Sequence, residues 1–442
     1  MLAKTEKCLS STLGCRPATV DRLCVVAIAV SKQIFKTMAS ARRSALAATR
    51  APLMREWIYS MLYDPVDGYF SKHKAPVAPM TSPIPFPSLE TRHDYLAYVA
   101  AQYATLETKW LTPSEIFSPY LGRAIANHIA SLGVTRVVEI GSGTGTLARD
   151  IVDSLKAREY ADRKFEFVSI EISKSLSERQ AARMEGAGHA DVYRSRHADA
   201  LLESTWRQFA DEQPTLIVGL EVLDNLPHDK VQVVDGVWHQ TRVQVQQREA
   251  FGETLREALE PVTDDGPILR ALDAYERVKS APAQRTTRDA MFKWLLDATE
   301  TPDPVWLPTG AEQLVRAVAS TVPNHELLLG DFDFLPGVAI AGEFAPIVSS
   351  TVDGKARDRG ELLSAPRGSV DIFFPTDFRL LAAMYEQVGA GCAVEIFKAH
   401  EFLGMVACDD VLTACTLADG SIPLLSDFVN TSFARLSSTL HV

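Results

Sequence analysis

A glycine-rich segment between a short apolar run and a helical pattern constrains the fold of this chain most. Residues 135–155 read TRVVEIGSGTGTLARDIVDSL. The β-branched run predicts a buried strand, the glycines predict a tight loop, and the spacing of Leu147, Ile151 and Leu155 predicts a helix. Strand, glycine loop and helix in this order are typical of α/β folds, in which a parallel sheet carries helices on both faces.

The same alternation of strand and helix continues along the chain. Three further buried strands are predicted by FEFVSIEIS at 165–173, PTLIVGLEVLDNLP at 214–227 and HELLLGDFDFLPG at 325–337. Between the first two lies KSLSERQAARME, a helix-forming stretch, and a shorter unit, ADVYRSRHADAL. We therefore expect a doubly wound, mostly parallel sheet of the Rossmann-like kind. Ligands of such sheets bind at the carboxyl ends of the strands.

The glycine spacing favours S-adenosylmethionine over a dinucleotide. Gly141, Gly143 and Gly145 are spaced by two residues. Glycine lets the backbone turn sharply and approach a ligand without a Cβ in the way, and the following helix N-terminus faces the same crevice. A dinucleotide fingerprint would need glycine at position 146, which is Thr146 here. A plain structural turn is the alternative. The residues expected to bind the cofactor in this loop are Glu139, Gly141, Ser142, Gly143 and Gly145.

Two acids that follow the next strands complete the expected cofactor site. Glu171 ends the second strand, where a carboxylate can accept hydrogen bonds from both ribose hydroxyls. Its alternative is an ordinary exposed acid at a strand end. Asp199 follows the third unit, where enzymes with this cofactor contact the adenine amino group. A helix N-cap is a near-equal alternative for Asp199.

A polar cluster ends the strand predicted at 214–227, opposite the glycine loop. It reads EVLDNLP and holds Glu221, Asp224 and Asn225. Three polar groups at this place are positioned to hold a methyl acceptor, because the carboxyl ends of neighbouring parallel strands meet at one edge of the sheet. The alternative is the start of a helix that Asp224 or Asn225 caps.

The pattern divides the chain into five segments. Residues 1–53 are a leader, and residues 54–118 form an N-terminal, proline-rich cap on the substrate side. Residues 119–245 hold the first half of the cofactor-binding core and end in a hairpin that turns at Asp235 and Gly236. Residues 246–300 are expected to be a charged helical insertion, and residues 301–442 complete the core.

Composition excludes several classes of protein. The net charge of −11 argues against a nucleic-acid binder, because phosphate neutralisation needs a basic face. The apolar run at 23–30 is far shorter than the roughly 20 residues that span a bilayer. None of the six cysteines forms a C-x-x-C pair or has histidines at zinc spacing, so we expect no metal site.

The composition near the N-terminus suggests a targeting segment. Residues 38–57 carry Arg42, Arg43, Arg50 and Arg55, with no acid before Glu56. An Arg-rich, Ser/Ala-rich and acid-poor stretch is the signature of a mitochondrial transit segment. An amphipathic first helix is an equal alternative. We expect the mitochondrial matrix as the location, with the cytoplasm as the alternative.

Seven motifs in a fixed order resemble one known family. The chain is similar to the mitochondrial complex I assembly-factor methyltransferases and their bacterial MidA relatives from about residue 54 onward. The family usually has Pro and Arg within the glycine loop, where this chain has Ser142 and Thr144. The motifs are GYF at 68–70, TPSEIFSPYLG at 112–122, VEIGSGTGTLARDI at 138–151, IEISKSLSERQ at 170–180, GLEVLDNLPHDKVQ at 219–232, GDFDFLPG at 330–337 and VDIFFPTDF at 370–378.

The resemblance implies a class I methyltransferase that uses S-adenosylmethionine and acts on an arginine of a protein, such as a complex I subunit. It also implies that Glu115 lies on the acceptor side. We expect Glu221 and Asp224 to clamp the guanidinium by bidentate hydrogen bonds, with Glu115 closing from the N-terminal segment. Two alternatives stay open, a catalytically weak or inactive assembly factor and a methyltransferase with a small-molecule acceptor. The sequence gives no indication of the oligomeric state.

Overall fold

The computed structural model describes residues 50–71, 80, 82–105, 111–157, 164–249, 252–281, 303–352, 355–389 and 392–438. Contacts divide the chain into two units, Met1–Pro52 and Leu53–Val442, and the second unit is described below. Of the expected transit stretch at 38–57, residues 38–49 lie outside the described residues, whereas residues 54–57 form the first turn of helix α3 (Met54–Tyr63).

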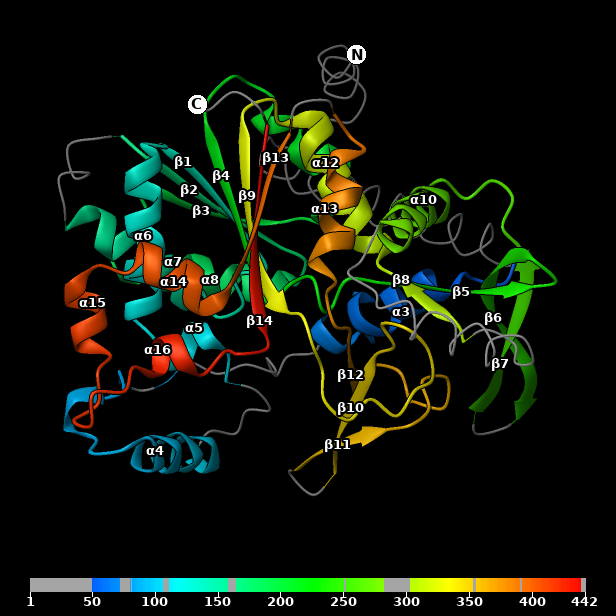
Figure 1. Ribbon diagram of the computed structural model, residues 1–442, viewed down its shortest axis with the longest axis horizontal. Helices are drawn as coiled ribbons and strands as arrows, with labels where there is room; N and C mark the ends of the chain where they lie inside the picture. The colour runs from blue at the N-terminus through cyan, green and yellow to red at the C-terminus, as the bar shows by residue number, and fades with distance from the viewer. Residues whose placement is uncertain are drawn as a thin grey trace, which may run out of the picture. The chain divides into compact units, whose positions relative to one another are not determined.

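A seven-stranded sheet forms the centre of the second unit (Figure 1). Five neighbouring strands are parallel, and β14 pairs antiparallel with both β9 and β13. The expected mostly parallel α/β sheet is therefore confirmed. In spatial order the strands are β13 (Ala393–Lys398), β14 (Thr431–Ser437), β9 (His325–Phe332), β4 (Thr215–Leu220), β1 (Arg136–Ile140), β2 (Glu166–Glu171) and β3 (Tyr193–His197).

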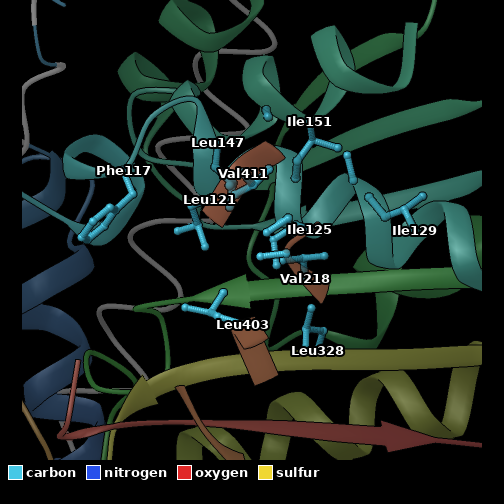
Figure 2. Packing of buried hydrophobic residues seen from close by; sticks show 14 of the residues in the cluster. Phe117, Leu121, Ile125, Ile129, Leu147, Ile151, Val218, Leu328, Leu403 and Val411 are labelled. Carbon is cyan, nitrogen blue, oxygen red and sulfur yellow. The ribbon is translucent and has the colours of Figure 1, made fainter. Parts of the chain in front are cut away.

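One face of this sheet packs against a helix that precedes the glycine loop, two helices that follow it and three helices near the C-terminus. Val218 and Leu328 point to this face, where Ile125, Ile151 and Leu403 cover them (Figure 2). Gly133, with φ 68°, ends the first of these helices in the left-handed conformation. The helices on this face are α6 (Tyr120–Leu132), α7 (Thr146–Lys156), α8 (Lys174–Gly186), α14 (Ala399–Val406), α15 (Asp409–Ala414) and α16 (Pro423–Ser426).

The other face uses the alternate residues of the same strands. Val138, Ile217 and Leu327 point to it, as the two-residue period of a strand requires. The two faces together explain why these strands are continuously apolar in sequence. The helices on the second face are α9 (Glu203–Trp206), α10 (Gly266–Ser280), α12 (Thr309–Thr321) and α13 (Phe378–Glu386).

A four-stranded antiparallel sheet adjoins the core. Its strands are β5 (Asp229–Val234), β6 (Val237–Glu249), β7 (Gly252–Pro261) and β8 (Val305–Leu307). The hairpin expected at Asp235 and Gly236 is confirmed, since both residues have positive φ, 50° and 76°.

The helical prediction for residues 246–261 is wrong. These residues end β6 and form β7, which pair from His239 with Pro261 to Glu249 with Gly252. Pairing along a long hairpin satisfies the backbone groups. Leu255 also packs against the apolar residues between helix Met54–Tyr63 and the smaller sheet, which are described next. Of the expected insertion, only α10 is helical within the described residues.

A third, smaller sheet packs with the N-terminal helix. The order of its strands is β11 (Lys355–Arg359), β10 (Ile347–Val352) and β12 (Val370–Phe373). Helix α3 (Met54–Tyr63) buries Trp57, Ile58 and Met61 against Val348 and Ile372 of this sheet. The remaining helices are α4 (Arg92–Thr105), α5 (Pro113–Ile116) and the short 3-10 turns Tyr69–Ser71, Phe86–Ser88 and Arg207–Phe209. Within the described ranges, no helix combines the length and apolarity that a membrane span requires.

Candidate functional site

A cavity of about 440 Å³ opens at the carboxyl ends of β1, β2 and β4. Eleven residues were considered from the sequence for the cofactor or the acceptor, and the structure brings ten of them to its wall. Gly145 is the exception, because it packs against α8 instead. The ten are Glu115, Glu139, Gly141, Ser142, Gly143, Glu171, Asp199, Glu221, Asp224 and Asn225.

The three glycines of the loop have positive φ, between 51° and 77°. This conformation explains why the loop needs glycine at each position. A Cβ at Gly141 would lie 3.0 Å from Val222 Cγ2, and one at Gly145 would lie 3.3 Å from Gln180 Cγ. A Cβ at Gly143 would meet no atom within 4 Å. The backbone of Gly143 therefore faces open space at the cavity.

Glu139 and Ser142 support the loop from beneath. The Ser142 hydroxyl lies 2.5 Å from Glu139 Oε2 and 2.7 Å from the Ser169 hydroxyl. Tyr193 donates a further hydrogen bond of 2.9 Å to Ser169. Burial raises the pKa of Glu139 to about 7, although the bond from Ser142 opposes this shift. These groups fix the conformation of the loop, and two of them, Glu139 and Ser142, also line the cavity.

Glu171 is oriented by its neighbours toward the glycine loop. The Ser173 amide donates to Oε1 at 2.8 Å, and Gln180 Nε2 donates to Oε2 at 3.2 Å. The same Gln180 nitrogen donates to the Gly143 carbonyl at 2.9 Å. Burial raises the pKa of Glu171 to about 7. Gln180 therefore connects the second acid to the loop, a role that the sequence did not reveal.

Asp199 lines the cavity and closes a turn, whereas the N-cap of α9 (Glu203–Trp206) is Leu202, so the capping alternative is not observed. Its Oδ1 accepts the Leu201 amide at 2.9 Å, which closes a turn ahead of α9. Its Oδ2 accepts the Tyr59 hydroxyl at 2.8 Å and lines the cavity. Tyr59 lies 140 positions earlier in the sequence, on α3. No local pattern could have linked these two residues.

Glu221 follows β4 in a strained backbone conformation. Its φ is 52°, which is uncommon for a residue with a side chain and typical of functional sites. The Glu221 amide donates to the Gly330 carbonyl at 2.9 Å and so holds this conformation. Burial, and secondly the charge of Asp331, raises the pKa of Glu221 well above its usual value.

Asp224 is buried with an oxygen left over. Its Oδ1 has no hydrogen-bond partner among the residues that the structure describes. Burial and the charges of Asp331, Asp371 and Glu221 raise the pKa of Asp224 well above its usual value. No helix begins at Asp224 or Asn225, where the chain forms a turn, so the capping alternative is not observed.

Asp331 supports this turn from β9. Its Oδ2 accepts the Asp224 amide at 3.0 Å and its Oδ1 accepts the Phe332 amide at 2.7 Å. Burial raises the pKa of Asp331 to about 7. Asp331 does not line the cavity and acts through the backbone of the turn.

Asp371 is an acid of the cavity that the sequence analysis missed. Asn225 Nδ2 donates to Asp371 Oδ1 at 3.1 Å and to the Ile372 carbonyl at 3.0 Å. The Asn225 carbonyl in turn accepts the Tyr63 hydroxyl at 3.0 Å. The turn after β4, strand β12 and helix α3 are therefore joined at one residue. The GSVDIFF segment carried a strand signal only, so its acid was not singled out.

Glu115 lies against the donor loop, which differs from its expected role on the acceptor side. Its Oε1 accepts the Thr144 hydroxyl and, at 2.7 Å, the Thr146 hydroxyl. Its Oε2 accepts the Met80 amide at 3.3 Å. The Thr146 hydroxyl also accepts Arg183 Nη1 at 2.9 Å. Because Oε1 is engaged by Thr144 and Thr146 and Oε2 by Met80, Glu115 ties the N-terminal segment to the glycine loop and the start of α7.

The cavity wall carries acids and no bases among the described residues. A buried site that gathers several carboxyl groups favours a positively charged ligand. Three tyrosine and phenylalanine rings add flat surfaces, since Tyr63 lies 5.3 Å from Tyr59 and 5.5 Å from Phe70 between ring centroids. The seven acids are Glu115, Glu139, Glu171, Asp199, Glu221, Asp224 and Asp371.

Comparison with known proteins places the chain in a family. The model of a family of S-adenosyl-L-methionine-dependent methyltransferases matches residues 120–397, more than half of the chain. A Drosophila melanogaster relative, protein arginine methyltransferase NDUFAF7 homolog, mitochondrial, is 26% identical over 210 residues. That match covers 42% of this chain and 48% of the relative, so it spans about half of the relative's length.

Two crystal structures of Burkholderia thailandensis proteins share the fold. One, solved with S-adenosyl-homocysteine bound, has a TM-score of 0.61 at 18% identity and the other a TM-score of 0.55 at 17%. Each match covers 91% of this chain and 92% of the other chain. The expected fold, the cofactor and the resemblance to the assembly-factor methyltransferases are confirmed by these comparisons together. The chain belongs to this family of methyltransferases, whose methyl donor is S-adenosyl-L-methionine.

Proposed function

We propose that this protein transfers the methyl group of S-adenosylmethionine to the guanidinium of an arginine in a partner protein. One observation carries the proposal. Glu221, Asp224 and Asp371 line the same cavity as the glycine loop, and the described residues that line it include no lysine, arginine or histidine. A guanidinium is permanently charged and planar, with donors that match carboxylates two by two.

The donor side of the cavity fits the cofactor. S-adenosylmethionine supplies an electrophilic methyl group when it is bound. We assign Glu171 to the ribose hydroxyls and Asp199 to the adenine amino group, because both carboxylates line the cavity. The open space beside Gly143 lets a ligand approach the backbone of the loop.

On the acceptor side, we assign Glu221 and Asp224 to the guanidinium. Carboxylates that accept its N–H groups confine the positive charge to part of the group, so the nitrogen that faces the methyl keeps its lone pair available. Holding that nitrogen in line with the reacting carbon is the main contribution of the protein to the rate. The free Oδ1 of Asp224 provides one of the acceptors that this arrangement requires.

Methylation of a guanidinium releases one proton, because the product keeps a single positive charge. The nitrogen that gains the methyl group loses a hydrogen, which needs an acceptor within reach. Glu221 suits this task, since its raised pKa makes its carboxylate a stronger base than an exposed glutamate. Because Glu221 lines the cavity, its carboxyl can then pass the proton to water there.

We extend the proposal to the mitochondrial matrix and to a subunit of complex I as the substrate. The Arg-rich, acid-poor stretch at 38–57 supports the location, as does the name of the Drosophila relative, which describes that protein as mitochondrial. The complex I substrate rests on the motif resemblance. A fluorescent fusion of the full chain tests the location directly, because an even cytoplasmic signal would contradict it.

The test of the activity uses the purified full chain with tritium-labelled S-adenosylmethionine and a mitochondrial extract. We expect label in protein, with methylarginine recovered after acid hydrolysis and the site found by mass spectrometry. Asp224→Asn should abolish most of the label while binding of S-adenosylhomocysteine, measured by calorimetry, is kept.

The other outcomes separate the alternatives. If only a small molecule were labelled, the methyl acceptor would be a metabolite and not a protein. Normal cofactor binding without transfer to any fraction would favour the inactive assembly factor. Label on lysine or on a carboxyl group would contradict the guanidinium assignment.

A further inference from the structure

Helix α3 spans both halves of the cavity with one of its faces. Arg55, Tyr59 and Tyr63 are four residues apart and therefore lie along the same side of the helix. Both tyrosines line the cavity, and Arg55 precedes them by one turn. Each of the three makes its polar contact with a different part of the core.

Arg55 fixes the start of the helix. Its Nη1 lies 2.6 Å from Asp229 Oδ2 and its Nη2 lies 2.6 Å from Asp265 Oδ2. The Asp229 side chain is buried and also accepts the Thr309 hydroxyl at 2.8 Å. A buried carboxylate that is hydrogen-bonded on both oxygens makes a rigid anchor for the helix.

Tyr59 contacts the donor half. Its hydroxyl donates to Asp199 Oδ2 at 2.8 Å, while the Leu201 amide holds Oδ1 at 2.9 Å. The two bonds fix the plane of the carboxylate. Each oxygen has two lone pairs, so both can accept another donor from the cavity.

Tyr63 contacts the acceptor half one turn further on. Its hydroxyl donates to the Asn225 carbonyl at 3.0 Å, and the Asn225 side chain holds Asp371. A shift of the helix at Tyr59 would therefore also move the support of the turn that follows β4.

We propose that Tyr59 is a positioning residue for the donor. It fixes Asp199 against the adenine amino group, and α3 thereby links occupation of the donor half to the order of the acceptor half. The inference rests on the proposed function in one respect, the assignment of Asp199 to the adenine. It adds a physical connection between two halves that share no strand.

The first experiment compares two ligands that differ along the N1–C6 edge of the base, because the 6-oxo base also carries a proton on N1. S-adenosylhomocysteine carries the 6-amino donor, whereas S-inosylhomocysteine carries a 6-oxo acceptor that Asp199 would repel. We expect wild type to prefer the amino ligand by about tenfold or more in calorimetry, the size of one lost hydrogen bond to a charged group. Tyr59→Phe should reduce this ratio to about threefold or less.

The matched control is Tyr275→Phe. Tyr275 also donates to a carboxylate, Glu343 Oε2 at 2.9 Å, and does not line the cavity. This variant should keep the ligand ratio of wild type. A merely structural role for Tyr59 would weaken both ligands equally and leave the ratio unchanged, which would overturn the inference.

The second experiment follows α3 itself by amide hydrogen exchange. Saturating S-adenosylhomocysteine should slow exchange over residues 54–63 in wild type and in Tyr275→Phe. In Tyr59→Phe, at a ligand concentration that saturates it, the slowing should be lost or at least halved. Equal slowing in all three proteins would show that the helix responds without Tyr59 and would refute the link.

These outcomes are independent of the methyl acceptor. If wild type distinguished the two bases and Tyr59→Phe did not, the inference would stand even if no arginine were methylated. If wild type bound both ligands equally, Asp199 would not face the amino group, and the inference would fail while methyl transfer could still be observed.

Discussion

The donor half and the acceptor half of the cavity are built in different ways. The donor acids and glycines lie on β1, β2, β3 and the loops that follow them, within residues 136–199. The acceptor half combines α3, the turn after β4 and β12, so that Tyr63, Asn225 and Asp371 meet across more than 300 positions.

This difference teaches how each half acquires its geometry. In the donor half the local fold of the loop determines where the ligand contacts lie, because each glycine conformation is set by its neighbours. In the acceptor half the geometry depends on the docking of separate elements. We therefore expect changes in one half at residues outside α3 to leave the binding function of the other largely intact.

The largest expected effects come from two substitutions, one in each half of the cavity, that should change different quantities. Glu221→Gln should lower kcat/KM by about 100-fold, the cost of losing one partner of a buried charged pair, and change the Kd of S-adenosylhomocysteine less than twofold. Glu171→Gln should raise that Kd by about tenfold, because one charged acceptor for the ribose is lost. Calorimetry and a labelled-methyl assay measure both. Loss of cofactor binding in Glu221→Gln would show that the two halves are not separable.

A second test uses a pair of glycines with similar backbone strain. Gly143 has φ 51° at the cavity, and Gly133 has φ 68° at the end of α6, and a Cβ at either would meet no atom within 4 Å. Alanine at each should cost about 1 kcal/mol of unfolding free energy. Gly143→Ala should also weaken cofactor binding by at least about tenfold, since its Cβ occupies space that the ligand needs. Equal affinities for the two variants would remove Gly143 from the donor site.

The third prediction concerns pH. With a pKa of about 7, Glu171 is protonated below neutrality, and its ribose contacts are strongest when it is ionised. The affinity for S-adenosylhomocysteine should therefore fall as the pH drops, by about fivefold from pH 8 to pH 6. Glu171→Gln should flatten this dependence. A profile that keeps its slope in the variant would assign the titration to another carboxyl, such as Glu139.

The smallest effect is expected at Tyr63. Tyr63→Phe removes one neutral hydrogen bond to the Asn225 carbonyl and should raise KM for the acceptor about threefold. In the same variant, the Kd of the cofactor reports on the donor half. This Kd should change by a smaller factor than the KM for the acceptor. The reverse order of these two changes would contradict the division of the cavity.

The sequence predicted the donor half well for a physical reason. A positive φ requires glycine and a buried parallel strand requires continuous apolar residues, so both leave marks on neighbouring positions. The turn at Asp235 and Gly236 was predictable because it also has positive φ. A helix N-cap depends on residue type in a similar local way, as at Asp377, whose side chain accepts the Arg379 and Leu380 amides.

Contacts between distant segments left no such marks. Tyr59 is one of eleven tyrosines, and only the docking of α3 brings it to Asp199. Glu115 was expected beside the acceptor, but Thr144 and Thr146 offer it two hydroxyls within the donor loop. The strand β7 was expected to be helical because its charged residues suit a helix, and its pairing with β6 overrides that preference.

The position of β14 has a consequence for how the chain folds during its synthesis on the ribosome. This strand follows all the others in sequence, yet it lies between β9 and β13. While it is still inside the exit tunnel, β9 presents an open edge and β13 has no neighbour. The central sheet is therefore complete only after residue 437 has been synthesised. A chain that ends before residue 431 would keep an unpaired strand edge, which is prone to aggregation and needs protection by a chaperone.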